Sequence, residues 1–450
     1  MYFKTYLPFY KRNLNVAFPV MLSQAGQVLV QQVDNMMVGR VGTTELAAVS
    51  FANSIFIIGM VMGMGFTFGL TPLTGHEWAT GNHKKASSLF RNSMLTNFIM
   101  AIVLALVLFS ISFFMKYMGQ PPQVIEEAVP YFRILVVSMI PFLMFFTFKQ
   151  FTEGLGNTKI AMYITLSANA LNIFLNYILI FGKMGFPALG VNGAGYASLI
   201  ARTIMPILFL VIYLKKDWLK RYFILLRKTT FNRKQIRDLI KIGYPISGQM
   251  LLEVSAFALS GVMMGWIGEI PLAAHQIALG LASVTFMIVT GIASATTIRV
   301  SHQYSRQNYK SMYKAAMASV HLVLAFMTTT ALLFLIFRSS LPKIYTPNPE
   351  VITLASQLLI MAAIFQIFDG MQVAMLGVLR GLADVKQAMF YAFFAYLVVN
   401  LPLAYLLTFI FEMGPIGIWT GFVAGLGIAA IMFYIRFRKQ YLILSQKSVR

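Results

Sequence analysis

Three carboxylates lie inside apolar segments of the sequence, and their positions suggest chemistry. Asp34, Glu253 and Asp369 have mostly apolar neighbours, although only 14 of the 450 residues are acidic. A charged side chain at the bilayer centre costs about 2.5 to 3.5 kcal/mol on the mildest scale, so such residues usually serve a function. A carboxylate that water cannot reach must be protonated, paired or neutralised by a bound cation. Exchange between these states is what coupling to an ion gradient requires.

Two amides could join Asp34 in a first cation site. Asn172 and Asn176 are four residues apart, which places them on one face of a helix. Amides on a lipid-bathed helix must find polar partners, so this face should turn inward. Hard Na⁺ prefers several oxygen ligands, which carboxylates and amides supply. The alternative is that both asparagines only hydrogen-bond helices together.

The other two carboxylates could form a second site. Two neighbouring carboxylates can share one proton or bind one cation, so we expect Glu253 and Asp369 to act together. Two different cations could then compete for one negative site. Phe365 and Phe368 flank Asp369, and aromatic faces attract organic cations. Phenylalanine is abundant, however, with 39 residues, so packing or lipid contact is the alternative for both rings.

Composition assigns these residues to an all-α membrane protein. Apolar residues make up 58% of the chain, charged residues 11%, and the mean hydropathy is +0.73. There is no cysteine, which excludes disulfides and thiolate metal sites. Because one crossing needs roughly 20 residues, the sequence predicts twelve transmembrane helices. Their approximate ranges are 16–39, 46–71, 93–115, 130–150, 160–182, 193–214, 240–266, 272–298, 318–338, 352–379, 389–411 and 417–435.

An internal repeat divides the chain into two six-helix bundles. Leu46-Ala47-Ala48 recurs as Leu272-Ala273-Ala274, and Lys159 recurs as Lys386 in a register that differs by a single position. The expected domains are an N-terminal bundle (1–214), a basic cytoplasmic linker (215–239) and a C-terminal bundle (240–450). Both repeats begin on the same side, so their pseudo-two-fold axis should run along the membrane normal. Two such bundles would enclose a central cleft suited to alternating access.

The basic residues predict the orientation. With both termini in the cytoplasm, 29 of the 36 Lys and Arg residues fall on the inner side. The formal net charge of +22 is therefore expected to face anionic lipid and not nucleic acid. Arg202 remains inside a span, where it could pair with a buried acid or extend to the interface.

The sequence resembles one transporter family over nearly its whole length. Asp34 followed by the segment from Val38 to Ala48, and Gly154–Lys159 echoed by Gly381–Lys386, are similar to the multidrug and toxic compound extrusion (MATE) family. The three acids resemble its NorM-type bacterial branch. The resemblance implies export of cationic, lipophilic or aromatic drugs in exchange for Na⁺ or H⁺. It also implies that Ser54 and Gln276 line the cleft, whereas Phe365 stands where a tyrosine is expected.

From this resemblance we expect a monomer in the bacterial inner membrane, with small organic cations as substrates and no cofactor besides the coupling ion. A lipid-linked oligosaccharide flippase of the same wider fold is the alternative. That function should require cationic residues in the cleft to meet pyrophosphate, and only Arg202 is a candidate. An intramembrane enzyme is disfavoured, because the five histidines do not cluster and no glycine-rich phosphate loop is present.

Overall fold

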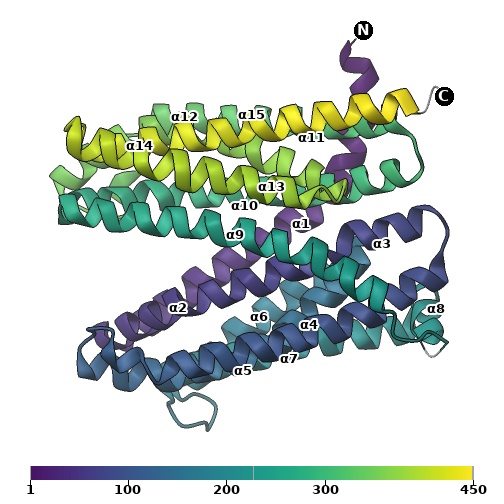
Figure 1. The fold of residues 1–450 in the computed structure, drawn as a ribbon. Coiled ribbons are helices and arrows are strands. Elements are labelled where there is room, and N and C mark those ends of the chain that lie inside the picture. Colours follow the sequence, from purple (N-terminus) through teal and green to yellow (C-terminus); the bar gives the residue numbers. More distant parts are fainter. Residues whose placement is uncertain (1, 227, 448–450) are drawn as a thin grey trace. The chain divides into compact units, whose positions relative to one another are not determined.

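The computed structural model describes residues 2–226 and 228–447, and every regular element in that part of the chain is helical (Figure 1). Its contacts divide the chain into two compact units. The first unit is Leu22–Ser247, and the second combines Met1–Met21 with Gly248–Arg450. The predicted all-α membrane class is confirmed. The predicted domain boundaries at 214 and 239 remain a prediction beside this contact-based division.

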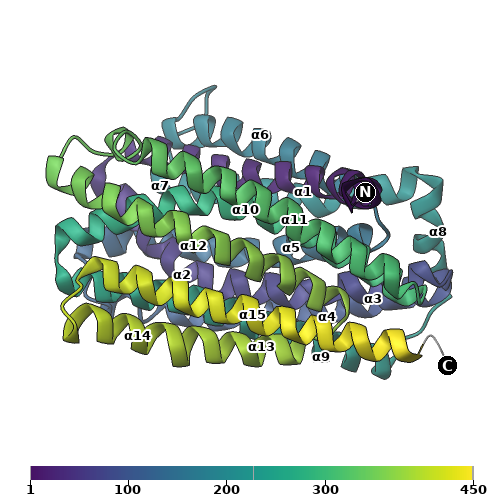
Figure 2. The ribbon, with the colours of Figure 1, turned by 90° about the horizontal axis from the view of Figure 1, so that it is seen from above.

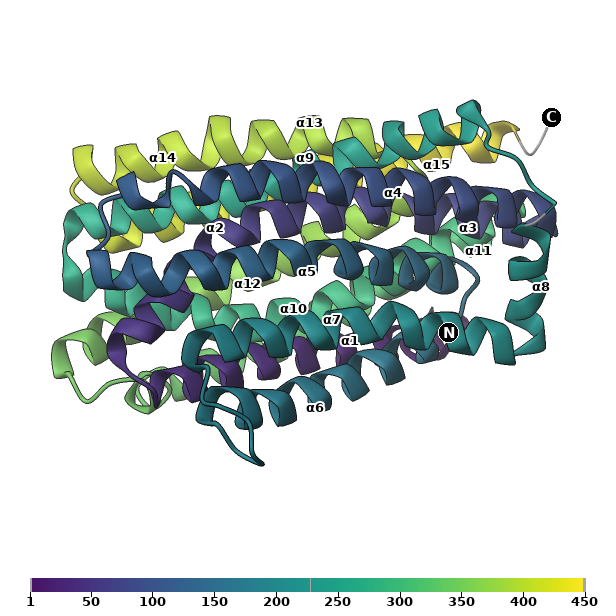
Figure 3. The same cartoon turned by 90° about the horizontal axis from the view of Figure 1, so that it is seen from below.

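The first unit is built around α5 (Pro122–Gly154), which packs against α2, α4 and α7. In Figure 3, α5 lies between α4 and α7, and α6 lies beyond α7. The unit also includes the second part of α1 (Tyr2–Gly39) and the start of α9. Its other helices are α2 (Thr43–Phe68), α3 (Leu70–Ala79), α4 (His83–Ser112), η1 (Met115–Tyr117), α6 (Lys159–Phe181), α7 (Gly190–Lys215) and α8 (Asp217–Leu226).

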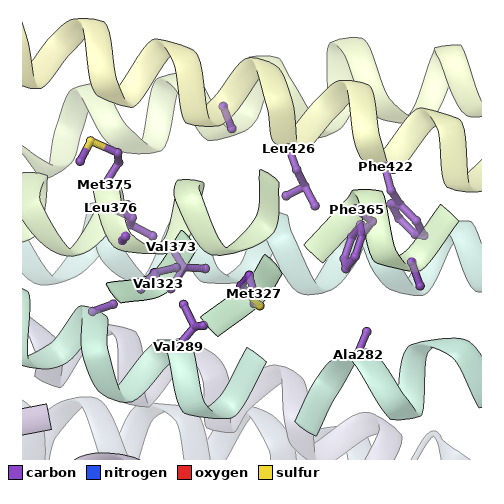
Figure 4. Packing of buried hydrophobic residues seen from close by; sticks show 14 of the residues in the cluster. Ala282, Val289, Val323, Met327, Phe365, Val373, Met375, Leu376, Phe422 and Leu426 are labelled. Carbon is purple, nitrogen blue, oxygen red and sulfur yellow. The ribbon is translucent and has the colours of Figure 1, made fainter. Parts of the chain in front are cut away.

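The second unit is built around α12 (Pro349–Gly381), which packs against α10, α11 and α15. Figure 2 shows α12 between α11 and α15, with α13 and α14 beside α15. The core between these helices is filled by apolar side chains, among them alanine, valine, leucine, methionine and phenylalanine (Figure 4). The helices are α9 (Arg233–Ile267), α10 (Glu269–Ser305), α11 (Tyr309–Phe337), η2 (Pro342–Ile344), α13 (Val385–Phe393), η3 (Phe394–Asn400), α14 (Leu401–Tyr405), η4 (Leu406–Ile410) and α15 (Pro415–Lys447).

Each predicted transmembrane segment coincides with a helix or with a run of consecutive helices. Within the described residues, eleven helical segments are long and apolar enough to cross a membrane. The twelfth is α1, whose hydropathy is lowered by several glutamines between Gln24 and Gln32. The helices extend beyond the predicted ranges, as α1 does from residue 16 back to Tyr2. The reason is that hydropathy detects only the part of a helix that matches the bilayer core.

The first turns of α1 are anchored in the second unit. Asn13 is fully buried, and its Nδ2 donates to the Ala315 carbonyl (2.9 Å) and to Ser319 Oγ (2.8 Å). Arg299 Nε donates to Asn13 Oδ1 at 3.3 Å. These long-range hydrogen bonds explain why Met1–Met21 belongs with the C-terminal helices.

Helix α8 lies in the predicted linker and packs on the start of α4. Ser87 Oγ donates to the carbonyl of Tyr222 (2.7 Å), and His83 Nδ1 lies 2.9 Å from the Tyr222 hydroxyl. Tyr222 and Leu219 are buried, while Lys220 of the same helix is exposed. The helix is therefore amphipathic.

Candidate functional site

In the first unit, the structure brings together the three residues predicted as a cation site. Asn176 Nδ2, from α6, donates to Asp34 of α1 and also to Asn172 Oδ1 at 3.2 Å. Asn172 donates to Ser198 of α7 at 3.4 Å. Both asparagines are buried, at 5% and 0% exposure. The arrangement combines a carboxylate with two amides, which is a donor set that could hold a proton or a hard monovalent cation.

Arg202, on α7, is a charged residue of the same unit whose surroundings are polar and aromatic. Its Nη1 donates to Ser138 (2.7 Å), and its guanidinium carbon lies 4.7 Å from the centroid of the Phe142 ring. Its positive charge acts on Asp34 across the site. The sequence left open whether Arg202 pairs with an acid or extends to the interface. In the structure its guanidinium bonds Ser138, and among the described residues it forms no ion pair with Asp34.

In the second unit, Glu253 of α9 is the centre of a polar network. Its carboxylate accepts from Gln249 Nε2 (2.9 Å) and from Gln372 Nε2 (3.4 Å). Gln372 Oε1 in turn accepts from the Tyr396 hydroxyl at 3.0 Å. The two glutamine amides therefore donate to Glu253, and Tyr396 donates to one of these amides.

Asp369 belongs to the same network. It is 3% exposed, and its charge interacts with that of Glu253. Its Oδ1 atom has no hydrogen-bond partner among the described residues. Leaving a buried acceptor unpaired is costly, so this oxygen stands out from the other polar atoms of the network.

Sequence reasoning missed four members of this network, namely Gln249, Gln372, Tyr396 and Arg380. Arg380 lies one residue beyond the predicted span 352–379, but it belongs to the last turn of α12 and donates to Gln249 Oε1 at 2.6 Å. Spacing could have revealed two of them, because Gln249 lies four residues before Glu253 and Gln372 three residues after Asp369. No sequence signal points to Tyr396 or Arg380.

The predicted substrate residues have different surroundings. Phe365 is 3% exposed and lies in an aromatic cluster, 5.5 Å from Trp419 and 5.8 Å from Phe422 between ring centroids. Figure 4 shows Phe365 beside Phe422. Phe368 is partly buried.

Ser54 and Gln276 are exposed on helices of different units, and Ser54 donates to the Phe51 carbonyl of its own helix at 2.7 Å. The substrate role of these four residues remains a prediction, as does the substrate role of Asp34 and Asp369.

The donor sets suit a weakly held monovalent cation or a proton. Among the described residues, no group of three or more acidic, histidine or cysteine side chains could hold a metal ion. Each site instead combines one or two carboxylates with neutral amides. Buried carboxylates in polytopic helical proteins often mark ion pathways, so the fold and these residues point to the class of membrane transporters.

Comparison with known proteins agrees with this class. The MatE family model matches residues 19–178 and 245–406. The "Multidrug resistance protein NorM" of Photobacterium profundum is 34% identical over 432 residues, covering 95% of each chain. The protein of that name in Vibrio vulnificus (strain YJ016) is 33% identical and covers 94% of each chain. The chain therefore belongs to the MATE family.

Solved structures support the fold. A structure described as the outward-facing conformation of a multidrug resistance MATE family transporter has a TM-score of 0.87 and covers 97% of both chains. At 20% sequence identity, this likeness concerns the fold alone.

Proposed function

We propose that this protein exports cationic, lipophilic or aromatic compounds in exchange for Na⁺ or H⁺ by alternating access. The relatives described above are named multidrug resistance proteins, and this supports the substrate class. The observation that carries the proposal is that each unit holds buried carboxylates within its apolar helices. Asp34 in the first unit and Glu253 in the second accept hydrogen bonds from amides, and the charge of Asp369 interacts with that of Glu253.

The chemistry of exchange follows from charge. A cation or proton that enters a site neutralises the carboxylate and lowers its attraction for a cationic drug. When the ion leaves, the negative charge is restored and the drug binds again. Amides such as Asn176 stay neutral throughout, so they can orient the carboxylate in both states.

Transport in reconstituted vesicles tests this function. Efflux of a fluorescent lipophilic cation is followed under separate Na⁺ and proton gradients for wild type, Asp34→Asn, Glu253→Gln and Asp369→Asn. We expect at least two of the three variants to lose gradient-driven efflux by about tenfold or more while keeping their melting temperature. Full efflux in all three variants would refute the mechanism.

The gradient that drives wild-type efflux identifies the coupling ion.

A bacterial inner-membrane location with both termini in the cytoplasm is part of the same proposal. It is supported by the distribution of lysine and arginine.

A further inference from the structure

The helix that follows α12 is interrupted by a π-helical segment, η3 (Phe394–Asn400). π-Helical turns are rare and occur frequently at functional sites. A local cause is present in the sequence, because Pro402 has no N–H group to continue the α-helical hydrogen-bond ladder. The segment leads from α13 into α14 and packs against α15.

The π-helical segment presents two polar side chains to a cavity beside the second-unit site. Tyr396 and Asn400 are 2% and 3% exposed, and both line a cavity together with Glu253. The remaining walls are apolar, formed by Ala256, Phe257, Phe422 and Leu426. The cavity has a volume of about 10 Å³, which is close to the space of one water molecule.

The amide oxygen of Asn400 has no hydrogen-bond partner among the described residues. Leaving a buried acceptor unpaired costs about 1 to 3 kcal/mol, so such an atom usually has a use. Asn400 lies close to the backbone of α15, because a Cβ atom added to Gly425 would lie only 2.6 Å from Asn400 Cβ. Asp369 Oδ1, in the same network, also lacks a partner.

The repeat relates Asn400 to the first-unit site. In the register that aligns Lys159 with Lys386, the position equivalent to Asn172 is Val399, and Asn400 is the next residue. A π-helical turn holds one residue more than an α-helical turn, which accounts for this offset. In the first unit, Asn172 belongs to the hydrogen-bonded group around Asp34. In each unit, therefore, an asparagine on the equivalent helix lies by a buried carboxylate. Asn172 belongs to the group around Asp34, and Asn400 lines a cavity with Glu253.

We propose that Asn400 is a ligand of Na⁺ in the second unit, where its amide oxygen acts together with the carboxylates of Glu253 and Asp369. Carbonyl oxygens and carboxylates are the ligands that hard cations prefer. This proposal rests on the proposed function and deepens it, because it names the ion and a residue that sequence analysis did not identify.

Equilibrium binding of ²²Na⁺ to the purified full-length protein tests the proposal. The measurements use an Asp34→Asn background, so that binding reports the second unit. We expect Asn400→Leu, which keeps the size but removes the oxygen, to weaken Na⁺ binding by about tenfold or more. Asn400→Ala should do the same, and Asn400→Asp should retain binding because a carboxylate oxygen replaces the amide oxygen.

Thr408→Val is the matched control. Thr408 lies in the second π-helical segment, η4, is 4% exposed, and its hydroxyl also lacks a partner among the described residues. It does not line the cavity. We expect Na⁺ binding to be unchanged in this variant, and melting temperatures show whether each protein is folded.

Wild-type affinity in folded Asn400→Leu or Asn400→Ala would overturn the proposal, as would an equal loss in Thr408→Val. Absence of Na⁺ binding in the Asp34→Asn protein would also overturn it. The proposed function fails differently, through efflux that persists in the carboxylate variants. Efflux driven by protons alone would thus overturn the proposal that Asn400 is a Na⁺ ligand, but it would agree with the proposed export function.

Discussion

Arg380 donates a hydrogen bond of 2.6 Å to Gln249 Oε1, and Gln249 Nε2 donates to the carboxylate of Glu253. A guanidinium, an amide and a carboxylate are thereby linked in one line inside the second unit. With Asp369 included, the network contains two carboxylates and one guanidinium. When both acids are ionised, one negative charge remains, and one monovalent cation or one proton balances it.

Replacing Arg380 should therefore strengthen, or leave unchanged, the binding of a cation to the carboxylates of the second unit. In Arg380→Gln the balancing positive charge is absent, so ²²Na⁺ should bind at least as tightly as in wild type while gradient-driven efflux falls by about tenfold. Binding and vesicle efflux are measured on the same preparation. Arg436→Gln is the control, since Arg436 pairs with Asp384 at 2.6 Å outside the network. Weaker cation binding in Arg380→Gln would contradict the charge balance.

Removing the Asn176 amide should impair the first-unit site without unfolding the protein. Asn176→Ala loses the hydrogen bonds to Asp34 and Asn172, and we expect efflux to fall by about tenfold because the carboxylate is no longer oriented. The measurement is vesicle efflux beside a melting curve. Asn82→Ala is the comparison, because the Asn82 amide donates to an exposed threonine, Thr80. Equal effects of the two changes would argue against a role for Asn176.

Phe365 should be important for stability. Phe365→Ala removes a ring that is 3% exposed within an aromatic cluster, so the free energy of unfolding should fall by about 3 to 5 kcal/mol. A drop in melting temperature in detergent reports the loss. Phe390→Ala is matched in chemistry, but its ring is 60% exposed, and we expect little change. An unchanged melting temperature for Phe365→Ala would show that the cluster does not contribute to stability.

Asn13 should stabilise the attachment of the first turns of α1 to the second unit. Asn13→Ala leaves Ser319 and the Ala315 carbonyl without their donor, at a cost of about 1 to 3 kcal/mol in unfolding free energy. Thermal unfolding measures this cost, and proteolysis near the N-terminus should become faster. Thr329→Ala, on an exposed position whose hydroxyl bonds its own helix, should change stability by less than about 0.5 kcal/mol. A melting temperature equal to wild type would show that the anchor is not needed.

Local patterns predicted the helices and part of the sites. The apolar runs identified each membrane segment because hydropathy depends on neighbouring residues alone. The spacing of Asn172 and Asn176 placed both on one face, and the structure brings that face to Asp34. The helix ends were less predictable, since amphipathic turns outside the bilayer core resemble loops in hydropathy.

The sequence by itself determined that this is a helical membrane protein with a repeat and three carboxylates in apolar segments, because composition and periodicity carry that information along the chain. Only the tertiary structure decided which polar groups surround those carboxylates. Arg380 joins the network from α12 whereas Glu253 lies on α9, and Tyr396 reaches Gln372 from η3. Contacts of this kind depend on how helices pack and, at η3, on a π-helical turn, and no pattern of neighbouring residues specifies either.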